Sequence, residues 1–258
     1  MNPLVTAWHD AISAFSTTVS EIPDEAFAQP SLLPGWTVGD IVAHTAALEH
    51  ELASGEIPAH EPDWDALPHA DDLFSRYTEI GVDLRRGWSP QQLRADLAEA
   101  VAARVFDDID DNAPITGIGG MPLTFGKQMR MRCFDIVLHD LDLRDALGMT
   151  GPVLGDGARV CAEQIAGGLG YVWVKRAGAQ PGQVLHVVVP DWIDAWVGVS
   201  EDGRGHFVEP GEATVTVTIP QLQFLRLGSG RRGDTGAAEV AGDAELGRKV
   251  LAGLNVAP

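Results

Sequence analysis

The sequence of 258 residues predicts a two-domain α+β protein, with a four-helix bundle over residues 1–150 and an α+β domain over residues 151–258. Two observations carry this prediction. In the first part, apolar residues recur every three or four positions between recognisable helix caps. The second part is rich in valine, and one of its segments alternates threonine and valine with period two. The composition changes near Gly151.

The first domain is expected to contain four helical regions joined by short and medium links, which is the pattern of a bundle. Thr37 is the expected N-cap of the second region, Ser89 and Gln92 flank Pro90 as a capping box, and Gly148 is the expected last C-cap. The expected ranges are about Pro3–Val19, Thr37 to about Leu52, about Asp71–Arg86 followed by Pro90 to about Asp110, and, after the glycine-rich loop Thr116–Pro122, about Thr124–Leu147.

The second domain is expected to combine a few helices with several strands, as in an α+β unit. Its Glu-Asp-Gly-Arg-Gly segment at residues 201–205 is typical of a hairpin turn. The expected ranges are a helix at about Asp156–Trp173, strands at Gln183–Val189, Ala195–Val199 and Ala213–Ile219, a short helix near Gln221–Leu227, a strand near Ala237–Val240 and a closing helix at about Asp243–Leu254.

The composition, 45% apolar and 21% charged, is that of an ordinary globular protein, and no run of eighteen apolar residues could span a bilayer. The start, MNPLVTAWHDAIS, lacks the segments of a secretory signal, so we expect a cytoplasmic location and no membrane partner. The net charge of −19 argues against a nucleic-acid partner. Cys133 and Cys161 are isolated, which indicates buried thiols rather than a disulfide framework.

His44 lies within the apolar stripe of the second predicted helix, three residues after Ile41. Its imidazole is therefore expected to point into the bundle. A core histidine satisfied by one hydrogen bond is the commoner explanation for such a residue taken alone. His50 lies on another helix face, and His60 and His69 lie in a predicted loop, so we expect all three to be solvent-exposed.

The last helix of the first domain carries three polar residues within an apolar sequence. Asp135, His139 and Asp142 are spaced by four and then three, so they share one face. Burying a carboxylate beside an imidazole is costly unless a hydrogen-bonded pair or a metal compensates. With His44, Asp135 and His139 would supply three ligands for a divalent metal, although a simple Asp–His pair fits the spacing equally well. Asp142 is expected to orient a ligand or pair with a neighbouring arginine.

Four segments resemble one protein family. LPGWTVGDIVAH, residues 33–44, and RCFDIVLHDLDLRDALG, residues 132–148, look like the DinB-like metal-binding bundle of the mycothiol-dependent maleylpyruvate isomerase family of actinobacteria. AGGLGYVWVKRAGA, residues 166–179, and GDAELGRKVLAGLNVAP, residues 242–258, look like the C-terminal domain that accompanies this bundle, which is similar to sterol-carrier-type folds. The resemblance covers nearly the whole chain.

The resemblance implies a divalent metal, usually zinc in the isomerase, held by a histidine of the second helix and an acid-x-x-x-His pair of the last. These positions are His44, Asp135 and His139 in this chain. The isomerase pattern has glutamate where this chain has the shorter Asp135. This departure leaves the particular substrate fit of the isomerase unsupported, and we therefore favour the broader reading of a thiol S-transferase over a cis–trans isomerase of an unsaturated keto acid.

The resemblance also implies mycothiol as the thiol cosubstrate, with a small electrophile as the second partner. Cys133 is rotated about 200° from Asp135 around the helix, so an external thiol would fill the role of nucleophile. A metal would lower the pKa of that thiol and could polarise a substrate carbonyl. Among Arg226, Arg231 and Arg232, the resemblance implies that Arg226 faces the active site, where it could hold a carboxylate in a pocket between the domains.

Two other functions fit the sequence. One is a non-catalytic, metal-stabilised protein whose C-terminal domain binds a small apolar or lipid-like ligand on its valine-rich strands. The other is a metal-dependent hydrolase that uses bound hydroxide, for which Asp142 is the nearby candidate for a general base.

Overall fold

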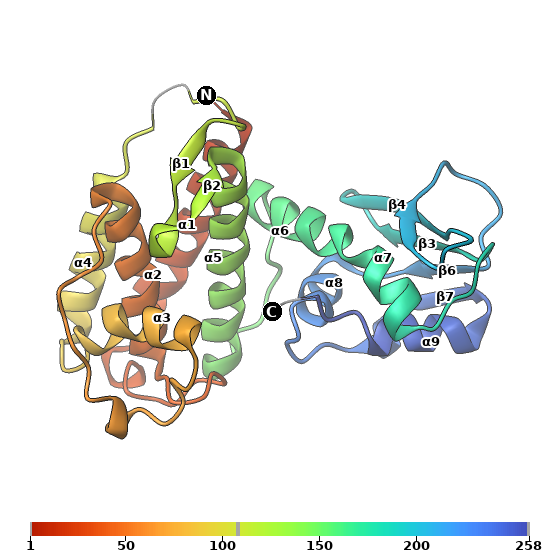
Figure 1. Ribbon diagram of the computed structural model, residues 1–258. Helices are drawn as coiled ribbons and strands as arrows, with labels where there is room; N and C mark the ends of the chain where they lie inside the picture. The colour runs from red at the N-terminus through yellow and green to blue at the C-terminus, as the bar shows by residue number, and fades with distance from the viewer. Residues whose placement is uncertain (1, 107–108, 257–258) are drawn as a thin grey trace. The chain divides into compact units, whose positions relative to one another are not determined.

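The computed structural model describes residues 2–106 and 109–256. Internal contacts divide the chain into two compact units: a first unit of Met1–Gly151 with Gly155–Gly157, and a second unit of Pro152–Leu154 with Ala158–Pro258. The first unit is mainly helical, whereas the second combines helices with a five-stranded sheet (Figure 1). The expected mixture of helix and sheet is confirmed.

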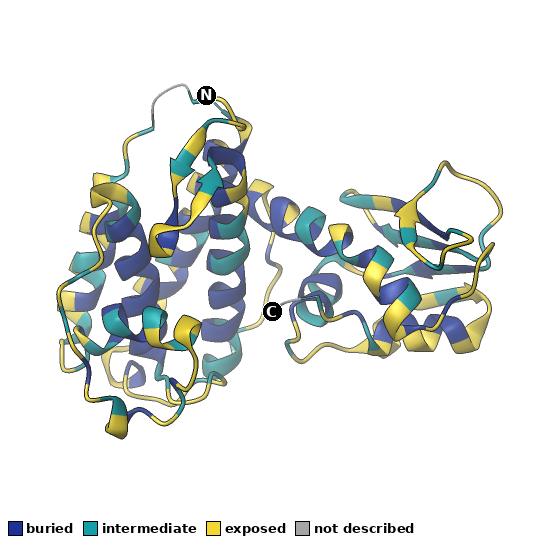
Figure 2. Ribbon diagram, in the orientation of Figure 1, coloured by how far each residue is buried: buried dark blue, intermediate teal, exposed yellow. Residues whose placement is uncertain are grey.

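Five helices form the frame of the first unit. They are Pro3–Glu21 (α1), Val38–Ser54 (α2), Leu73–Asp83 (α3), Pro90–Ala103 (α4) and Phe125–Leu147 (α5). α1 packs along α5, and α2 packs against α3, α4 and α5. The facing sides of these helices are buried (Figure 2), with Trp8, Phe15, Ile41 and Met129 among the largest fully buried side chains. Each such side chain stabilises the fold by about 1.5–3 kcal/mol.

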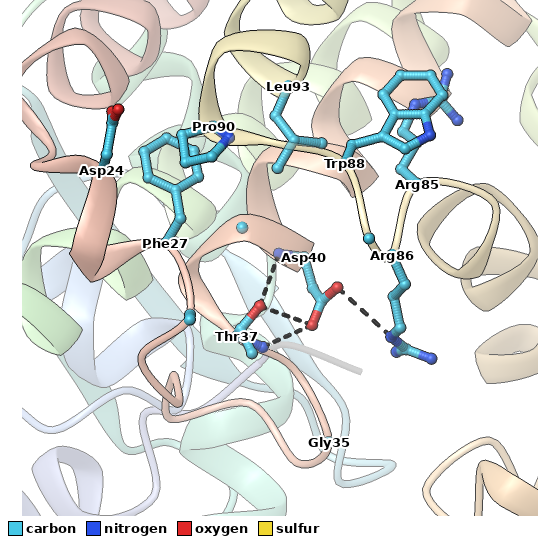
Figure 3. A pocket seen from close by; sticks show the side chains of 13 residues that line it. Asp24, Phe27, Gly35, Thr37, Asp40, Arg85, Arg86, Trp88, Pro90 and Leu93 are labelled. Atoms are coloured by element: carbon cyan, nitrogen blue, oxygen red, sulfur yellow. Dashed lines mark hydrogen bonds and ion pairs between the residues drawn. The ribbon is translucent and has the colours of Figure 1, made fainter.

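Caps determine where the principal helices begin and end, as the sequence predicts. Thr37 accepts a hydrogen bond from the backbone N–H of Asp40, and the Asp40 carboxylate accepts one from the N–H of Thr37 at 2.8 Å (Figure 3). Ser89 and Gln92 form the expected capping box of α4. Gly148 ends α5 in the left-handed conformation, with φ of 63°. The first four N–H groups of a helix have no partner within the helix, and each of the two N-cap side chains accepts a hydrogen bond from one of them.

Two predictions about the first unit are wrong in detail. α4 ends at Ala103 rather than near Asp110, because Arg104 adopts an extended conformation with ψ of 113°; residues 107–108 of the predicted extension lie outside the described residues. The glycine-rich loop is framed by an antiparallel hairpin of β1 (Pro114–Thr116) and β2 (Pro122–Thr124). Three-residue strands are too short to leave a periodic signal in the sequence.

The second unit contains a mixed sheet with strand order β5-β4-β3-β6-β7. Its strands are Val184–Val189 (β3), Ile193–Val199 (β4), Gly205–Phe207 (β5), Val215–Thr218 (β6) and Glu239–Gly242 (β7). β3 and β6 run parallel, and the other neighbouring pairs are antiparallel. The turn between β4 and β5 confirms the predicted hairpin. Alternate residues of β6 are buried, which explains the alternation of threonine and valine in its sequence.

The helices that lie wholly or mainly in the second unit are Asp156–Gly167 (α6), whose first two residues belong to the first unit, Leu169–Tyr171 (α7), Gln221–Gly228 (α8) and Ala244–Ala252 (α9). The predicted helix Asp156–Trp173 is interrupted after Gly167, and the chain continues through α7 into a π-helical turn. Two consecutive glycines have a low helix propensity, which favours a break there. Among the described helices, none has the length and apolarity that a membrane span requires.

Candidate metal centre

His44 of α2 lies beside Asp135 and His139 of α5. Oδ1 of Asp135 is 3.6 Å from Nε2 of His44 and 3.4 Å from Nε2 of His139. The two imidazole rings meet edge to face, with centroids 4.8 Å apart. One ligand atom from each of the three residues lies within 4.8 Å of the others. The structure thus brings together the three side chains that the sequence singles out.

This arrangement follows from the packing of two helices. The spacing of four residues puts Asp135 and His139 on one side of α5, and the apolar stripe of α2 carries His44 toward α5. His44 and His139 are buried, with 3% and 7% of their surface exposed. The Asp135 side chain keeps 31% of its surface exposed. Solvent therefore reaches the cluster at its carboxylate.

The donor atoms and their spacing fit a divalent ion. Two imidazole nitrogens and a carboxylate oxygen form a ligand set typical of zinc and other first-row metals, with a position left for another ligand. Ligand atoms in a tetrahedral zinc site lie about 3.3 Å apart, close to the 3.4 and 3.6 Å separations here. Moreover, Nδ1 of buried His44 has no hydrogen-bond partner among the described residues, which is costly for a plain core histidine.

The buried Arg132 side chain forms a hydrogen bond with Asp135. Its Nη1 donates to Oδ2 of Asp135 at 2.6 Å, while Oδ1 faces the two histidines. The Arg132 side chain is fully buried, and its Nε and Nη2 donate to Oε1 of Glu49 at 3.1 and 2.8 Å. Glu49 is also fully buried and accepts from Trp8 and Arg104. The orientation of Asp135 is therefore supported by a fully paired network of buried charges.

Asp142 supports His139 from the next turn of α5. Its Oδ2 lies 3.1 Å from Nδ1 of His139, and both residues are buried. A carboxylate on one ring nitrogen orients the imidazole and makes the other nitrogen the better metal ligand. Asp142 thus lies where it can act through His139.

The clustered groups shift one another's pKa. Burial disfavours the charged form of His139, but Asp135 and Asp142 outweigh burial and raise its pKa to about 9. Burial also opposes ionisation of Asp135, yet His139, Arg132 and His44 hold its pKa well below the usual range. Burial dominates at His44 and lowers its pKa. Since a ligating imidazole must be neutral, metal binding at these residues would release a proton.

A pocket of about 300 Å³ opens onto the three residues, and Trp36, His69 and Glu79 also line it. The Trp36 ring lies over both histidines, with its centroid 5.0 Å from that of His44 and 6.1 Å from that of His139. The volume is at the small end of the range for pockets that bind small molecules. The described part of the chain thus provides space for a ligand beside the cluster.

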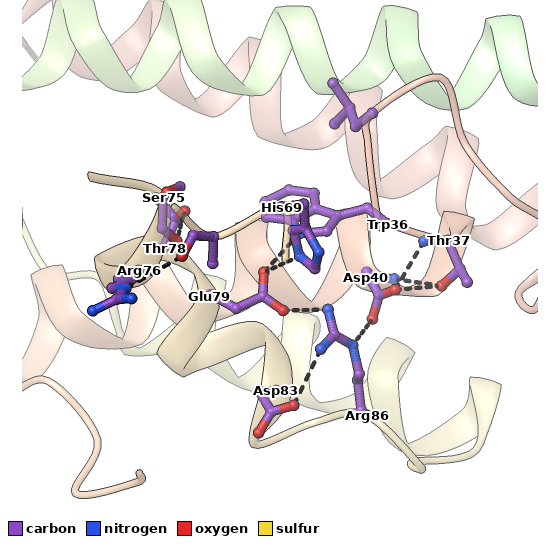
Figure 4. Close-up of polar contacts among 12 residues, drawn as sticks. Trp36, Thr37, Asp40, His69, Ser75, Arg76, Thr78, Glu79, Asp83 and Arg86 are labelled. Atoms are coloured by element: carbon purple, nitrogen blue, oxygen red, sulfur yellow. Dashed lines mark hydrogen bonds and ion pairs between the residues drawn. The ribbon is translucent and has the colours of Figure 1, made fainter. Parts of the chain in front are cut away.

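The prediction that three other histidines are solvent-exposed is wrong. His69 keeps only 17% of its side chain exposed, and its Nε2 lies 3.2 Å from Oε2 of Glu79 on α3 (Figure 4). His50 and His60 are also partly buried, each against an aspartate, at 2.9 and 2.7 Å. Their partners lie on other segments, so spacing along one helix does not reveal them. His69 and Glu79 are the pocket residues that sequence reasoning missed.

Arg226 lies on α8 in the second unit. Its Nη1 donates to the backbone carbonyl of Arg232 at 3.2 Å, and Nη1 of Arg231 donates to the carbonyl of Ser229 at 2.8 Å. The three arginines singled out by the sequence are therefore grouped at the C-terminal end of α8 and in the turn that follows it.

Both cysteines are buried, as the sequence predicts. Burial, more than any neighbouring charge, raises the pKa of Cys133 to about 12. Its thiolate form is therefore scarce at neutral pH. No cysteine of the described residues lines the pocket, so a thiol that reacts there would have to come from outside the chain.

The sequence profile of the mycothiol maleylpyruvate isomerase N-terminal domain matches residues 8–144. This chain belongs to that family. Its fold is similar to the crystal structure of mycothiol-dependent maleylpyruvate isomerase, with a TM-score of 0.54 and 19% sequence identity over 93% of either chain. A mutant of the same enzyme with one histidine replaced by alanine gives a TM-score of 0.51 at the same identity and coverage. A search of curated proteins found no match.

Proposed function

We propose that this protein is a mycothiol-dependent metalloenzyme that transfers the thiol to a small electrophile or uses it to assist a cis–trans isomerisation. The observation that carries the proposal is the convergence of His44, Asp135 and His139 beside a pocket of about 300 Å³. Membership of the family, and the mycothiol dependence named for its solved relatives, support mycothiol as the cosubstrate.

The three residues would hold a divalent ion, which we propose to be zinc. Such an ion would lower the pKa of a thiol and polarise a substrate carbonyl. The chain's own contribution is to orient the ligands: Arg132 engages Oδ2 of Asp135, and Asp142 engages Nδ1 of His139. These contacts favour a positioning role for Asp142 over that of the general base in a hydrolase.

We extend the proposal to the rest of the chain. Residues 1–150 would form a DinB-like four-helix bundle built on α1, α2, α4 and α5, and residues 151–258 a domain similar to sterol-carrier-type folds. Arg226 would hold a carboxylate of the substrate, since a guanidinium binds a carboxylate with two parallel hydrogen bonds. Replacing Arg226 by lysine should therefore raise KM for an anionic electrophile more than for a neutral one.

Elemental analysis and a thiol-transfer assay test the central proposal. His44→Ala and Asp135→Ala are compared with His50→Ala, which removes a histidine of α2 that pairs with Asp96 instead. Turnover of monochlorobimane is measured with and without mycothiol. We expect both site variants to lose stoichiometric metal and their mycothiol-dependent turnover by more than about 100-fold, because even loss of an outer partner costs 10–100-fold in metal affinity.

His50→Ala should retain the metal and the activity of the unaltered protein. Stoichiometric metal in both site variants would contradict the metal centre. Metal together with turnover that needs no mycothiol would contradict the cosubstrate, and a co-purified apolar ligand with unaltered properties in His44→Ala would favour a binding protein.

A further inference from the structure

His69 and Glu79 form a pair in the wall of the pocket that the proposed metal ligands also line. Nε2 of His69 lies 3.2 Å from Oε2 of Glu79. Nδ1 of His69 takes part in no hydrogen bond with the described residues. Glu79 thus engages one ring nitrogen of His69, and no described residue forms a hydrogen bond with the other.

Glu79 is a carboxylate with a fixed orientation. Only 1% of it is exposed, and its Oε2 accepts the indole N–H of Trp36 at 2.8 Å. Its Oε1 accepts from Arg86, so one oxygen is directed at His69 and Trp36 and the other at Arg86 (Figure 4). A carboxylate held in this way accepts Nε2–H of the histidine. The network therefore assigns the tautomer in which Nδ1 carries a lone pair, as a base requires.

Gly35 leaves room for the His69 ring because it has no side chain. A Cβ built on this glycine would lie 2.3 Å from Nδ1 and 2.5 Å from Cγ of His69, and its φ of +76° disfavours other residues. The imidazole therefore rests directly on the backbone of the turn that precedes Trp36. Although His69 belongs to no helix or strand, contacts with two separate segments determine its position.

We propose that His69, oriented by Glu79, is the catalytic base of this pocket, an inference that rests on the proposed thiol-dependent function. Nδ1 takes the proton from the S–H group of the bound thiol, and a sulfur electron pair forms the C–S bond with the electrophilic carbon. At a chlorinated carbon, the C–Cl electron pair leaves as chloride and the proton passes to water. At an alkene, the C=C pair moves to the adjacent carbon, which takes the proton back from Nδ1.

A similar pair outside the pocket provides a matched control. Nε2 of His60 lies 2.7 Å from Oδ2 of Asp83, which follows Glu79 by one turn of α3. Arg86 contacts both carboxylates. Each pair therefore joins a histidine Nε2 to a carboxylate that Arg86 also contacts, but of the two only the pair of His69 lines the pocket.

The test compares His69→Ala with His60→Ala in metal-replete protein, with mycothiol and monochlorobimane as substrates. We expect His69→Ala to lower kcat about 100-fold, the lower end of the effect of a positioned acid–base group. Its metal content and its KM for mycothiol should not change, and His60→Ala should keep the kcat of the unaltered protein. Added imidazoles of equal size should restore turnover of His69→Ala, and more so as the pKa of the added imidazole rises.

An unchanged kcat in His69→Ala would overturn this inference, and so would an equal loss in both variants. Rescue that depends on the size of the added base but not on its pKa would also overturn it, because that is the behaviour of a structural histidine. A protein that turns over normally with metal and mycothiol but fails these comparisons refutes the role of His69 alone. Absence of turnover in the unaltered protein refutes the proposed function itself.

Discussion

The pocket has two walls that are built differently. The helical wall consists of residues on α2 and α5, and the loop wall consists mainly of residues from connecting segments. The helical wall is His44, Asp135 and His139, and the loop wall is Trp36, His69 and Glu79. A helix sets the direction of a side chain by its position in the turn, whereas a loop residue acquires its direction from partners elsewhere in the fold. The comparison shows how far local sequence determines each wall.

The largest expected effect concerns the support of the helical wall. Arg132→Met should lower the free energy of unfolding by about 3–5 kcal/mol, because it removes the fully buried arginine that pairs with both Glu49 and Asp135 and leaves Arg104 as the remaining partner of buried Glu49. Urea denaturation measures the change. Arg130→Met, at an exposed position of α5, is the control and should stay within about 0.5 kcal/mol. Similar values for the two variants would mean that the buried network does not support this wall.

A smaller effect is expected from the partner of His139. Asp142→Asn should weaken zinc binding by about 10–100-fold, because the imidazole loses the carboxylate that orients it. Competition with a chelator of known affinity measures this. Asp140→Asn is the control: Asp140 contacts Thr18 and Arg144, so its loss should lower stability and leave zinc affinity unchanged. Equal zinc affinity in both variants would show that Asp142 does not contribute to zinc binding.

In the loop wall, two glycines with the same φ of +76° separate backbone strain from contact with His69. Gly55→Ala adds a Cβ to open space and should cost about 1 kcal/mol, whereas Gly35→Ala should cost about 2 kcal/mol or more, because it also displaces the imidazole. Thermal unfolding measures both. Reduced turnover is expected in Gly35→Ala only, and equal behaviour of the two variants would show that the contact with His69 has no consequence.

The smallest effect is expected where the two walls meet. Trp36→Phe retains a ring over the histidines but removes the N–H that donates to Glu79 at 2.8 Å. It should lower the free energy of unfolding by about 1 kcal/mol, the usual contribution of one hydrogen bond. Metal content should not change, since Trp36 provides no ligand. A loss of metal in this variant would mean that the two walls are coupled more strongly than their contacts indicate.

The helical wall could be predicted from the sequence because its information is local. The spacing of Asp135, His139 and Asp142 follows from the helical period, and the caps at Thr37 and Gly148 fixed the extent of their helices. The pairing of Arg132 with Glu49 was not predictable, because Glu49 lies on α2, 83 residues away in the chain. That contact exists only once the helices pack.

The loop wall could not be predicted for the same physical reason. His69 lies in a connecting segment whose sequence has no hydrophobic periodicity. Its burial depends on contacts with Glu79, ten residues later, and with Gly35, far earlier in the chain. The glycine of the Leu-Pro-Gly-Trp segment was the only local signal in the sequence. It indicates a turn but does not show which side chain packs against that turn.

By itself, the sequence determined most of the helices of the first unit with their principal caps, four of the five strands of the second unit, the inward direction of His44, and the shared helix face of Asp135 and His139. It did so because hydrophobic periodicity and capping act over a few residues. Only the tertiary structure decided which oxygen of Asp135 faces the histidines, which carboxylate orients His139, and that His69 belongs to the pocket. Those outcomes depend on burial and hydrogen bonds between distant segments, which form only when the chain has folded.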